Sequence, residues 1–167
     1  RARSVDVVLM SSSAGDKIDR RSFSLTGAPS DDVVMVDAAS QVLQLIERGE
    51  GPNVEYKRTL DTSKEGEYLE SITAFANTDG GFLLFGVDDN ARVCGWSGDA
   101  EKVLRDRIGD LCDPIPKIAV TEDIDVEGQP VTLVEVPKGK DRPYILKNRG
   151  IMVRVGASDR QVKRREL

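Results

Sequence analysis

The chain contains no histidine among its 167 residues. This absence excludes catalytic units of the Ser-His-Asp and Cys-His kinds, and it excludes metal sites built on imidazole. Any acid–base or metal chemistry must therefore fall to carboxylates, lysines or tyrosines. Cysteine is also scarce: Cys94 and Cys112 are too few for a disulfide framework and lack CxxC spacing. We therefore predict that both are reduced thiols.

Aromatic residues make up only 5% of the chain, so Val, Ile and Leu must supply most of the core. Long apolar runs are missing as well, and none approaches the roughly 18 residues that a membrane-spanning helix needs. Arg1–Arg3 is not followed by the apolar region of a signal peptide. These absences predict a protein that does not contact a membrane. They also predict that it lies in the cytoplasm, with the nucleus as an alternative compartment.

Charge is unevenly distributed along the chain, although the formal net charge is only −5. Residues 138–165 hold ten basic side chains against Asp141 and Asp159, a local net charge of +8 that leaves −13 for the remainder. Such polarity indicates either a surface for a polyanion or a solvated basic tail. The ten basic residues are Lys138, Lys140, Arg142, Lys147, Arg149, Arg154, Arg160, Lys163, Arg164 and Arg165.

The order of elements predicts an α+β fold. Apolar residues at helical spacing indicate helices over residues 37–48, 64–77 and 99–112. A short strand is expected at 54–60, and the run at 82–87 is apolar on both faces, which is typical of a central buried strand. The Gly80–Gly81 pair between helix and strand is interpreted as a helix stop.

Two β-hairpins follow, at 118–136 and 144–155, so we predict a mixed sheet with hairpins and about three packed helices. The α+β domain is expected to span residues 37–160. Residues 1–36, with short apolar runs at 5–10 and 21–25, are interpreted as an arm or the end of an upstream domain. Ser158 and Gln161 form a capping-box pattern, so residues 161–167 are predicted to begin a last, basic helix that continues beyond this sequence.

Three carboxylates are candidates for chemistry: Glu50 after the first helix, Glu55 near the start of a strand, and Asp89 at the exit of the buried strand. If the two strands are neighbours, these carboxylates meet and could hold Mg²⁺ or Mn²⁺ at a phosphate. Lys57 shares a strand face with Glu55 and could stabilise phosphate charge. Taken alone, however, Glu55–Tyr56–Lys57 is better explained as an exposed strand face. Gly139–Lys140 lacks the other residues of a P-loop, so no ATP site is evident.

Several sequence blocks, in order over residues 49–160, resemble the Schlafen AlbA_2 domain family. The blocks are Glu55–Lys57, Ala74–Gly81, Phe85–Asp89, Val93–Gly95 and Met152–Ala157. The resemblance implies an α+β core that binds nucleic acid, with residues 1–36 outside it. The family's acidic triad, Glu-x4-Glu-Phe-Lys followed by the second Asp of a GVDD block, matches Glu50, Glu55 and Asp89. Tyr56 stands in place of the Phe.

The resemblance leaves two activities open. One is a divalent-metal-dependent endoribonuclease acting on tRNA or other structured RNA. Glu50, Glu55 and Asp89 would then hold Mg²⁺ or Mn²⁺, with Lys57 at the scissile phosphate. The other is a non-catalytic DNA- or RNA-binding module of a transcriptional regulator. RNA is the favoured ligand, and a clamp of two lobes would require a homodimer. In either case the expected nucleic-acid contacts are Lys147, Arg149, Arg154, Arg160, Lys163 and Arg164.

Overall fold

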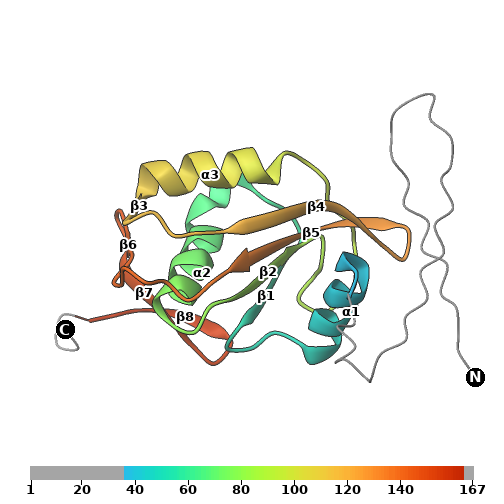
Figure 1. The fold of residues 1–167 in the computed structure, drawn as a ribbon, viewed down its shortest axis with the longest axis horizontal. Helices are drawn as coiled ribbons and strands as arrows, with labels where there is room; N and C mark the ends of the chain where they lie inside the picture. Colours follow the sequence, from blue (N-terminus) through green and yellow to red (C-terminus); the bar gives the residue numbers. More distant parts are fainter. Residues whose placement is uncertain (1–35, 164–167) are drawn as a thin grey trace, which may run out of the picture. The chain divides into compact units, whose positions relative to one another are not determined.

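A computed structural model describes residues 36–163 of the chain (Figure 1). The three predicted helices are present as α1 (Ala38–Arg48), α2 (Glu65–Asn77) and α3 (Ala100–Leu111). A short 3-10 helix, Thr62–Lys64, precedes α2. The runs at 5–10 and 21–25 and the proposed N-terminal arm lie outside the described residues, apart from Val36. None of the described helices is both long and apolar enough to cross a membrane.

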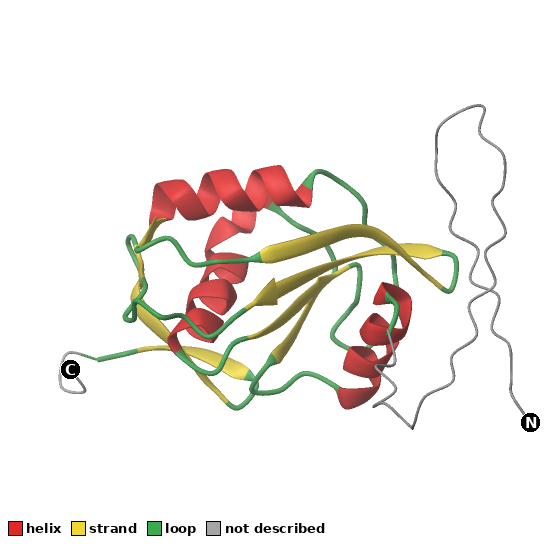
Figure 2. Cartoon of the chain, in the orientation of Figure 1, coloured by secondary structure: helices red, strands yellow, loops and turns green. Residues whose placement is uncertain are grey.

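The larger sheet contains β1 (Val54–Lys57), β2 (Gly81–Phe85), β4 (Ala119–Val126) and β5 (Gln129–Val136), in the order β1-β2-β5-β4. β1 and β2 run parallel because α2 connects them, whereas β5 is antiparallel to both of its neighbours. This mixed sheet with helices confirms the predicted α+β class (Figure 2). β1 ends at Lys57, three residues earlier than predicted.

A second sheet has the order β3-β6-β7-β8, with β3 at Cys112–Asp113, β6 at Ile145–Leu146, β7 at Gly150–Val155 and β8 at Ser158–Gln161. The predicted hairpin over 144–155 is confirmed as β6–β7.

The prediction that a helix starts at Ser158 is wrong. Ser158–Gln161 is instead strand β8, which pairs antiparallel with β7. A tight turn at Gly156, whose φ is +59°, brings β8 back along β7. Residues 164–167 lie outside the described part of the chain.

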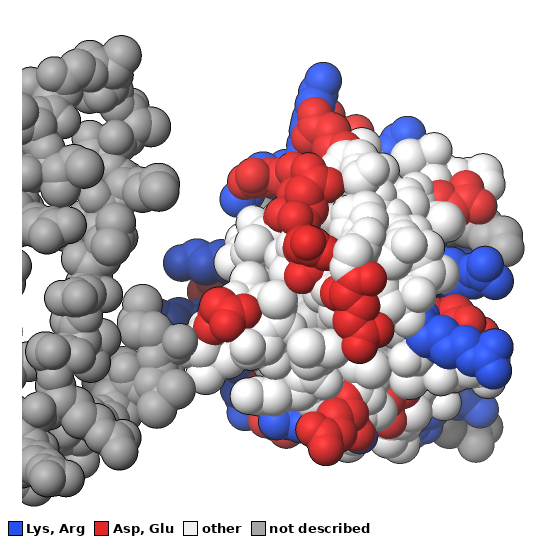
Figure 3. Space-filling view, turned by 90° about the vertical axis from the view of Figure 1, so that its right-hand side faces the viewer, with Lys and Arg blue, Asp and Glu red and all other residues white. Residues whose placement is uncertain are grey.

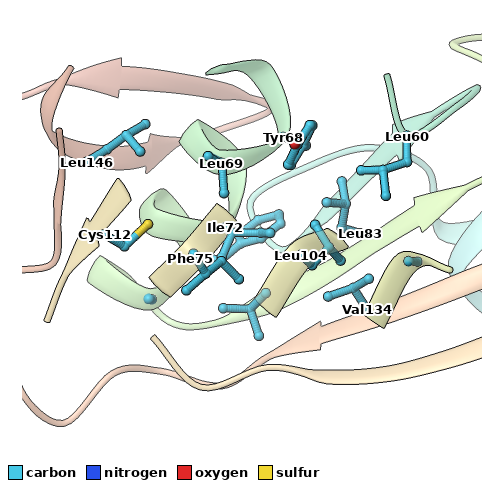
Figure 4. Close-up of a cluster of buried hydrophobic side chains, with 14 of the residues drawn as sticks. Leu60, Tyr68, Leu69, Ile72, Phe75, Leu83, Leu104, Cys112, Val134 and Leu146 are labelled. Atoms are coloured by element: carbon cyan, nitrogen blue, oxygen red, sulfur yellow. The ribbon is translucent and has the colours of Figure 1, made fainter. Parts of the chain in front are cut away.

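Two hydrophobic clusters cover the two faces of the larger sheet. The first joins α2 and α3 to Leu83 and Phe85 of β2 and reaches Leu146 of the second sheet. Figure 4 shows Leu69, Ile72 and Phe75 of α2 in the middle of this cluster. The second cluster joins α1 to the opposite face, where Leu84 of β2 is fully buried. β2 is therefore buried on both faces, as its continuous apolar run predicts.

The turn between α2 and β2 requires both of its glycines, which confirms the helix-stop interpretation. Gly80 has φ +80°, and its N–H donates to the Phe75 carbonyl at 2.9 Å. A Cβ on Gly81 would lie 2.6 Å from the Phe75 ring. Gly80 thus supplies the left-handed conformation that ends the helix, and Gly81 allows the strand to start against the core.

The two cysteines should differ sharply in reactivity. Cys94 is exposed, whereas Cys112 is buried and desolvation raises the pKa of its thiol to about 11, against a smaller opposite effect of Lys147. Because the thiolate is the reactive form, we expect one thiol to react quickly with a disulfide reagent at pH 8 and the second only on unfolding. Titration with and without denaturant measures this, with Cys94→Ser as control. Two fast thiols in the native protein would contradict it.

Candidate functional site

Glu55, at the second position of β1, lies between two cations. Its Oε1 accepts from Lys57 Nζ at 2.7 Å, and its Oε2 accepts from Arg154 Nη2 at 2.7 Å. The Glu55 side chain is only 11% exposed. The alternation of a strand explains why Glu55 and Lys57 share one face, but Arg154 arrives from 99 residues further along the chain. Both carboxylate oxygens are therefore engaged by the protein itself.

Arg154 is the centre of a buried ion network. Its guanidinium, with the side chain 1% exposed, also bonds Asp159 of β8 at 2.9 Å, and it donates to the carbonyls of Gly51 and Val54. The Ser71 hydroxyl of α2 donates to the other oxygen of Asp159 at 2.6 Å. We call this set (Lys57, Glu55, Arg154, Asp159 and Ser71) the buried network. It ties β1, β7, β8 and α2 together.

The structure buries Arg154, which the sequence predicted to contact nucleic acid. A phosphate can reach this guanidinium only if it displaces Glu55 or Asp159 from the interior. Arg154 also lies over the Phe75 ring, 5.1 Å from its centroid, so packing as well as ion pairs holds it in place. Its role in this conformation is to hold the two sheets against α2.

The charges in the network stabilise one another. Desolvation alone would lower the pKa of Lys57, but the hydrogen bond and the charge of Glu55 outweigh it and raise that pKa. The pKa of Arg154 is likewise raised, because Asp159 and Glu55 together outweigh the effect of burial. Both groups therefore stay cationic at neutral pH, and the network is electrically balanced across its two carboxylates.

Glu50 and Asp89, the other two predicted carboxylates, are not members of the buried network. Glu50 follows the C-terminal end of α1, and its Oε1 accepts the Tyr56 N–H at 2.8 Å. The pKa of Glu50 is raised, first by partial desolvation and then by the charges of Glu55 and Asp89, against the opposite effects of Tyr56 and Lys57. Asp89 is exposed in the turn after β2. Glu50 is thus within electrostatic reach of both of the other predicted carboxylates.

The same residues do not form a metal site as the structure arranges them. Among residues 36–163 no three acidic or cysteine side chains converge closely enough to hold an ion. Glu55 has no free oxygen, since Lys57 and Arg154 each take one. The donor set expected for Mg²⁺ or Mn²⁺ is therefore not assembled here, and we derive no metal-dependent step from it.

Tyr56 anchors α1 to β1. Its buried hydroxyl donates to the carbonyls of Leu45 and Ile46 at 2.9 and 3.1 Å, in the last turn of α1. Both carbonyls also accept the Gly49 N–H at 3.2 Å, so the phenol is an additional donor at this end of the helix. Burial, followed by the charge of Glu50, raises the pKa of Tyr56, so the phenol remains a donor. The hydroxyl thereby links the last turn of α1 to β1.

The other predicted contacts with nucleic acid are on the surface. Lys147 and Arg149 are exposed around the β6–β7 turn, and Arg160 and Lys163 are exposed on and after β8. Lys147 Nζ contacts the Asp110 carbonyl at the end of α3, where a cation complements the helix dipole. Arg149 pairs with Glu70 of α2 at 3.2 Å. Arg164 lies outside the described residues.

Lys138, Lys140 and Arg142 are exposed candidates that the site prediction omitted. Their signal was visible in the sequence as the basic cluster between Pro137 and Pro143, within the segment of high positive charge. The structure adds that this loop is anchored. Gly139 N–H donates to the Ala76 carbonyl at 2.8 Å, and the Asn77 side chain accepts from and donates to the Tyr144 backbone. We call residues 138–149 the basic segment.

Acidic side chains gather on another part of the domain. Viewed from the side of α1 and the β4–β5 turn, Asp and Glu form a band across the described surface, whereas Lys and Arg lie toward its borders (Figure 3). The described aromatic residues offer no stacking platform beside the basic segment, since Tyr144 is buried and Trp96 packs partly buried against Phe85. Charge, rather than base stacking, therefore distinguishes the basic segment.

The architecture and the charged site define a two-sheet α+β domain with a buried ion network and an exposed basic segment. Residues 50–163 match the family model of the Schlafen, AlbA_2 domain, and the chain therefore belongs to this family. It is also similar to a solved structure, the DIP2311 protein from Corynebacterium diphtheriae, with a TM-score of 0.54 and 23% sequence identity. That similarity covers 75% of this chain and 27% of the DIP2311 chain, and it shows a shared fold.

Proposed function

We propose that this domain binds nucleic acid through the backbone phosphates, with RNA as the preferred ligand. Membership of the Schlafen AlbA_2 family supports the ligand class. The observation that carries the proposal is the basic segment, in which Lys138, Lys140, Arg142, Lys147 and Arg149 are all exposed on anchored backbone. A cluster of exposed cations on fixed elements suits phosphate oxygens and gives little sequence specificity. Arg160 and Lys163 would extend the same contact, and a homodimer would supply a second basic segment.

The charge of the basic segment should set both the affinity and its salt dependence. We expect the double variant Lys140→Glu/Arg142→Glu to weaken binding of a labelled tRNA at least about tenfold and to flatten the slope of log Kd against log salt. Fluorescence anisotropy across a KCl series measures both quantities. Lys102→Glu/Lys117→Glu, a double change of the same total charge at two exposed lysines outside the basic segment, is the matched control. Binding that does not depend on salt, or equal losses in both variants, would contradict the proposal.

Metal-dependent cleavage is the second candidate, and what favours it is that the charges of Glu55 and Asp89 both act on Glu50. The test is incubation of the same tRNA, and of single-stranded DNA, with Mn²⁺ or EDTA. Asp89→Asn is the informative variant because Asp89 is exposed, so its loss should leave the fold intact. The binding proposal predicts retarded but intact nucleic acid throughout. Products that require Mn²⁺ and disappear in Asp89→Asn would instead establish a nuclease.

A further inference from the structure

Arg149 occupies a defined place on the surface of α2. It belongs to the β6–β7 turn, and its backbone N–H donates to the Leu146 carbonyl at 3.0 Å. Its Nη1 lies 3.2 Å from Glu70 Oε1. The rest of the guanidinium lies over Gly66, one helical turn before Glu70, where a Cβ would come within 3.0 Å of Nη2. The glycine therefore leaves room for this arginine on the helix.

The exposure of the two partners is unequal. The Arg149 side chain is 59% exposed, so one side of the guanidinium faces solvent, whereas the Glu70 side chain is only 21% exposed and is held on the helix. The other ion pair of the basic segment differs in this respect. Lys138 pairs with Asp79, whose side chain is 89% exposed and is free to move away when another anion arrives. Glu70 is thus a fixed negative charge beside an accessible arginine.

We propose that Glu70 is the resident anion of a phosphate-binding site centred on Arg149, so that Glu70 limits the affinity of the basic segment for nucleic acid. A guanidinium binds a phosphodiester most strongly with two N–H groups in parallel, and Glu70 already holds Nη1. A phosphate must displace this carboxylate or bind beside it, and a neighbouring negative charge weakens either mode. This inference rests on the proposed function and names Glu70 as the residue that tunes it.

Replacement of Glu70 by Gln tests the idea, because the amide oxygen can still accept from Arg149 while the charge is removed. We expect Glu70→Gln to tighten binding of a labelled structured RNA by about three- to tenfold at low salt and to steepen the salt slope. Arg149→Ala should weaken binding. In the Arg149→Ala background the gain from Glu70→Gln should fall below about twofold, since the two residues act as a pair.

Glu101→Gln is the matched control, since Glu101 also pairs with an arginine, Arg105 at 2.9 Å, but on α3. If Glu101→Gln tightens binding as much as Glu70→Gln, the effect is one of net charge and the inference is wrong. It is also wrong if Glu70→Gln changes nothing, or acts equally with and without Arg149. These results would leave the proposed function standing provided that wild-type binding depends on salt. Absence of any RNA binding by the wild type would overturn both.

Discussion

Replacement of Arg154 by leucine should lower the free energy of unfolding by about 3–5 kcal/mol, the range for removal of one partner from a buried ion pair. Leucine can still pack on the Phe75 ring, but it leaves Glu55 and Asp159 without their shared cation, and these side chains are only 11% and 12% exposed. The carbonyls of Gly51 and Val54 lose a donor as well. Urea unfolding followed by circular dichroism measures the change.

Arg149→Leu provides the matched control, because it removes an arginine with one ion pair and a side chain that is 59% exposed. Exposed pairs contribute little, so this variant should lose less than about 1 kcal/mol. Combining Arg154→Leu with Glu55→Gln and Asp159→Asn should recover part of the loss, since the remaining groups are neutral. If Arg154→Leu costs no more than Arg149→Leu, the buried network does not hold the fold.

The network also determines how variants of Glu55 must be interpreted. Loss of activity in Glu55→Gln is the usual sign of a catalytic carboxylate, yet here the same change leaves Arg154 with a weakened partner in the interior. We therefore expect this variant to lose stability whether or not the protein cleaves RNA. Exposed Asp89 does not carry this ambiguity, which makes it the better test of chemistry.

Asn77→Asp should lower the free energy of unfolding by about 2–4 kcal/mol, from two lost hydrogen bonds and a carboxylate placed against carbonyl oxygens. The Asn77 amide nitrogen donates to the carbonyls of Tyr144 and Met152 at 2.9 and 2.8 Å, and its oxygen accepts the Tyr144 N–H at 2.7 Å. The aspartate can still accept the Tyr144 N–H, but it has no N–H to donate to the two carbonyls, so a carboxylate oxygen faces each of them in repulsion. Thermal and urea unfolding measure the effect.

Asn90→Asp, in the exposed turn after β2, is the control of identical chemistry and should be nearly silent. Asn77 also anchors the segment that carries Lys138, Lys140 and Arg142, so Asn77→Asp should weaken RNA binding under conditions in which the protein remains folded. A variant as stable as Asn90→Asp would show that the α2 terminus does not anchor this segment.

The sequence by itself determined the regular elements of this protein. Apolar spacing placed three helices within about one residue of α1, α2 and α3, and the run that became β2 was correctly expected to be buried on both faces. Gly80–Gly81 was sufficient to place the end of α2. These features depend on periodicity and backbone conformation, which neighbouring residues dictate. The sequence blocks also identified the family, which the match over residues 50–163 confirms.

Only the tertiary structure decided which charges are buried and which remain available. In sequence, Arg154 looks like any other basic residue of the positively charged stretch 138–165, but in the fold it is buried and pairs with Glu55, which lies 99 residues earlier in the chain. Ser158–Gln161 has the local pattern of a helix start, yet pairing with β7 and the contacts of Asp159 make it a strand. Glu55 was expected to ligate a metal, but its two carboxylate oxygens bond the side chains of Lys57 and Arg154, which the fold brings to it. Long-range pairing overrides local preference, because the partners of a polar side chain are set by the fold.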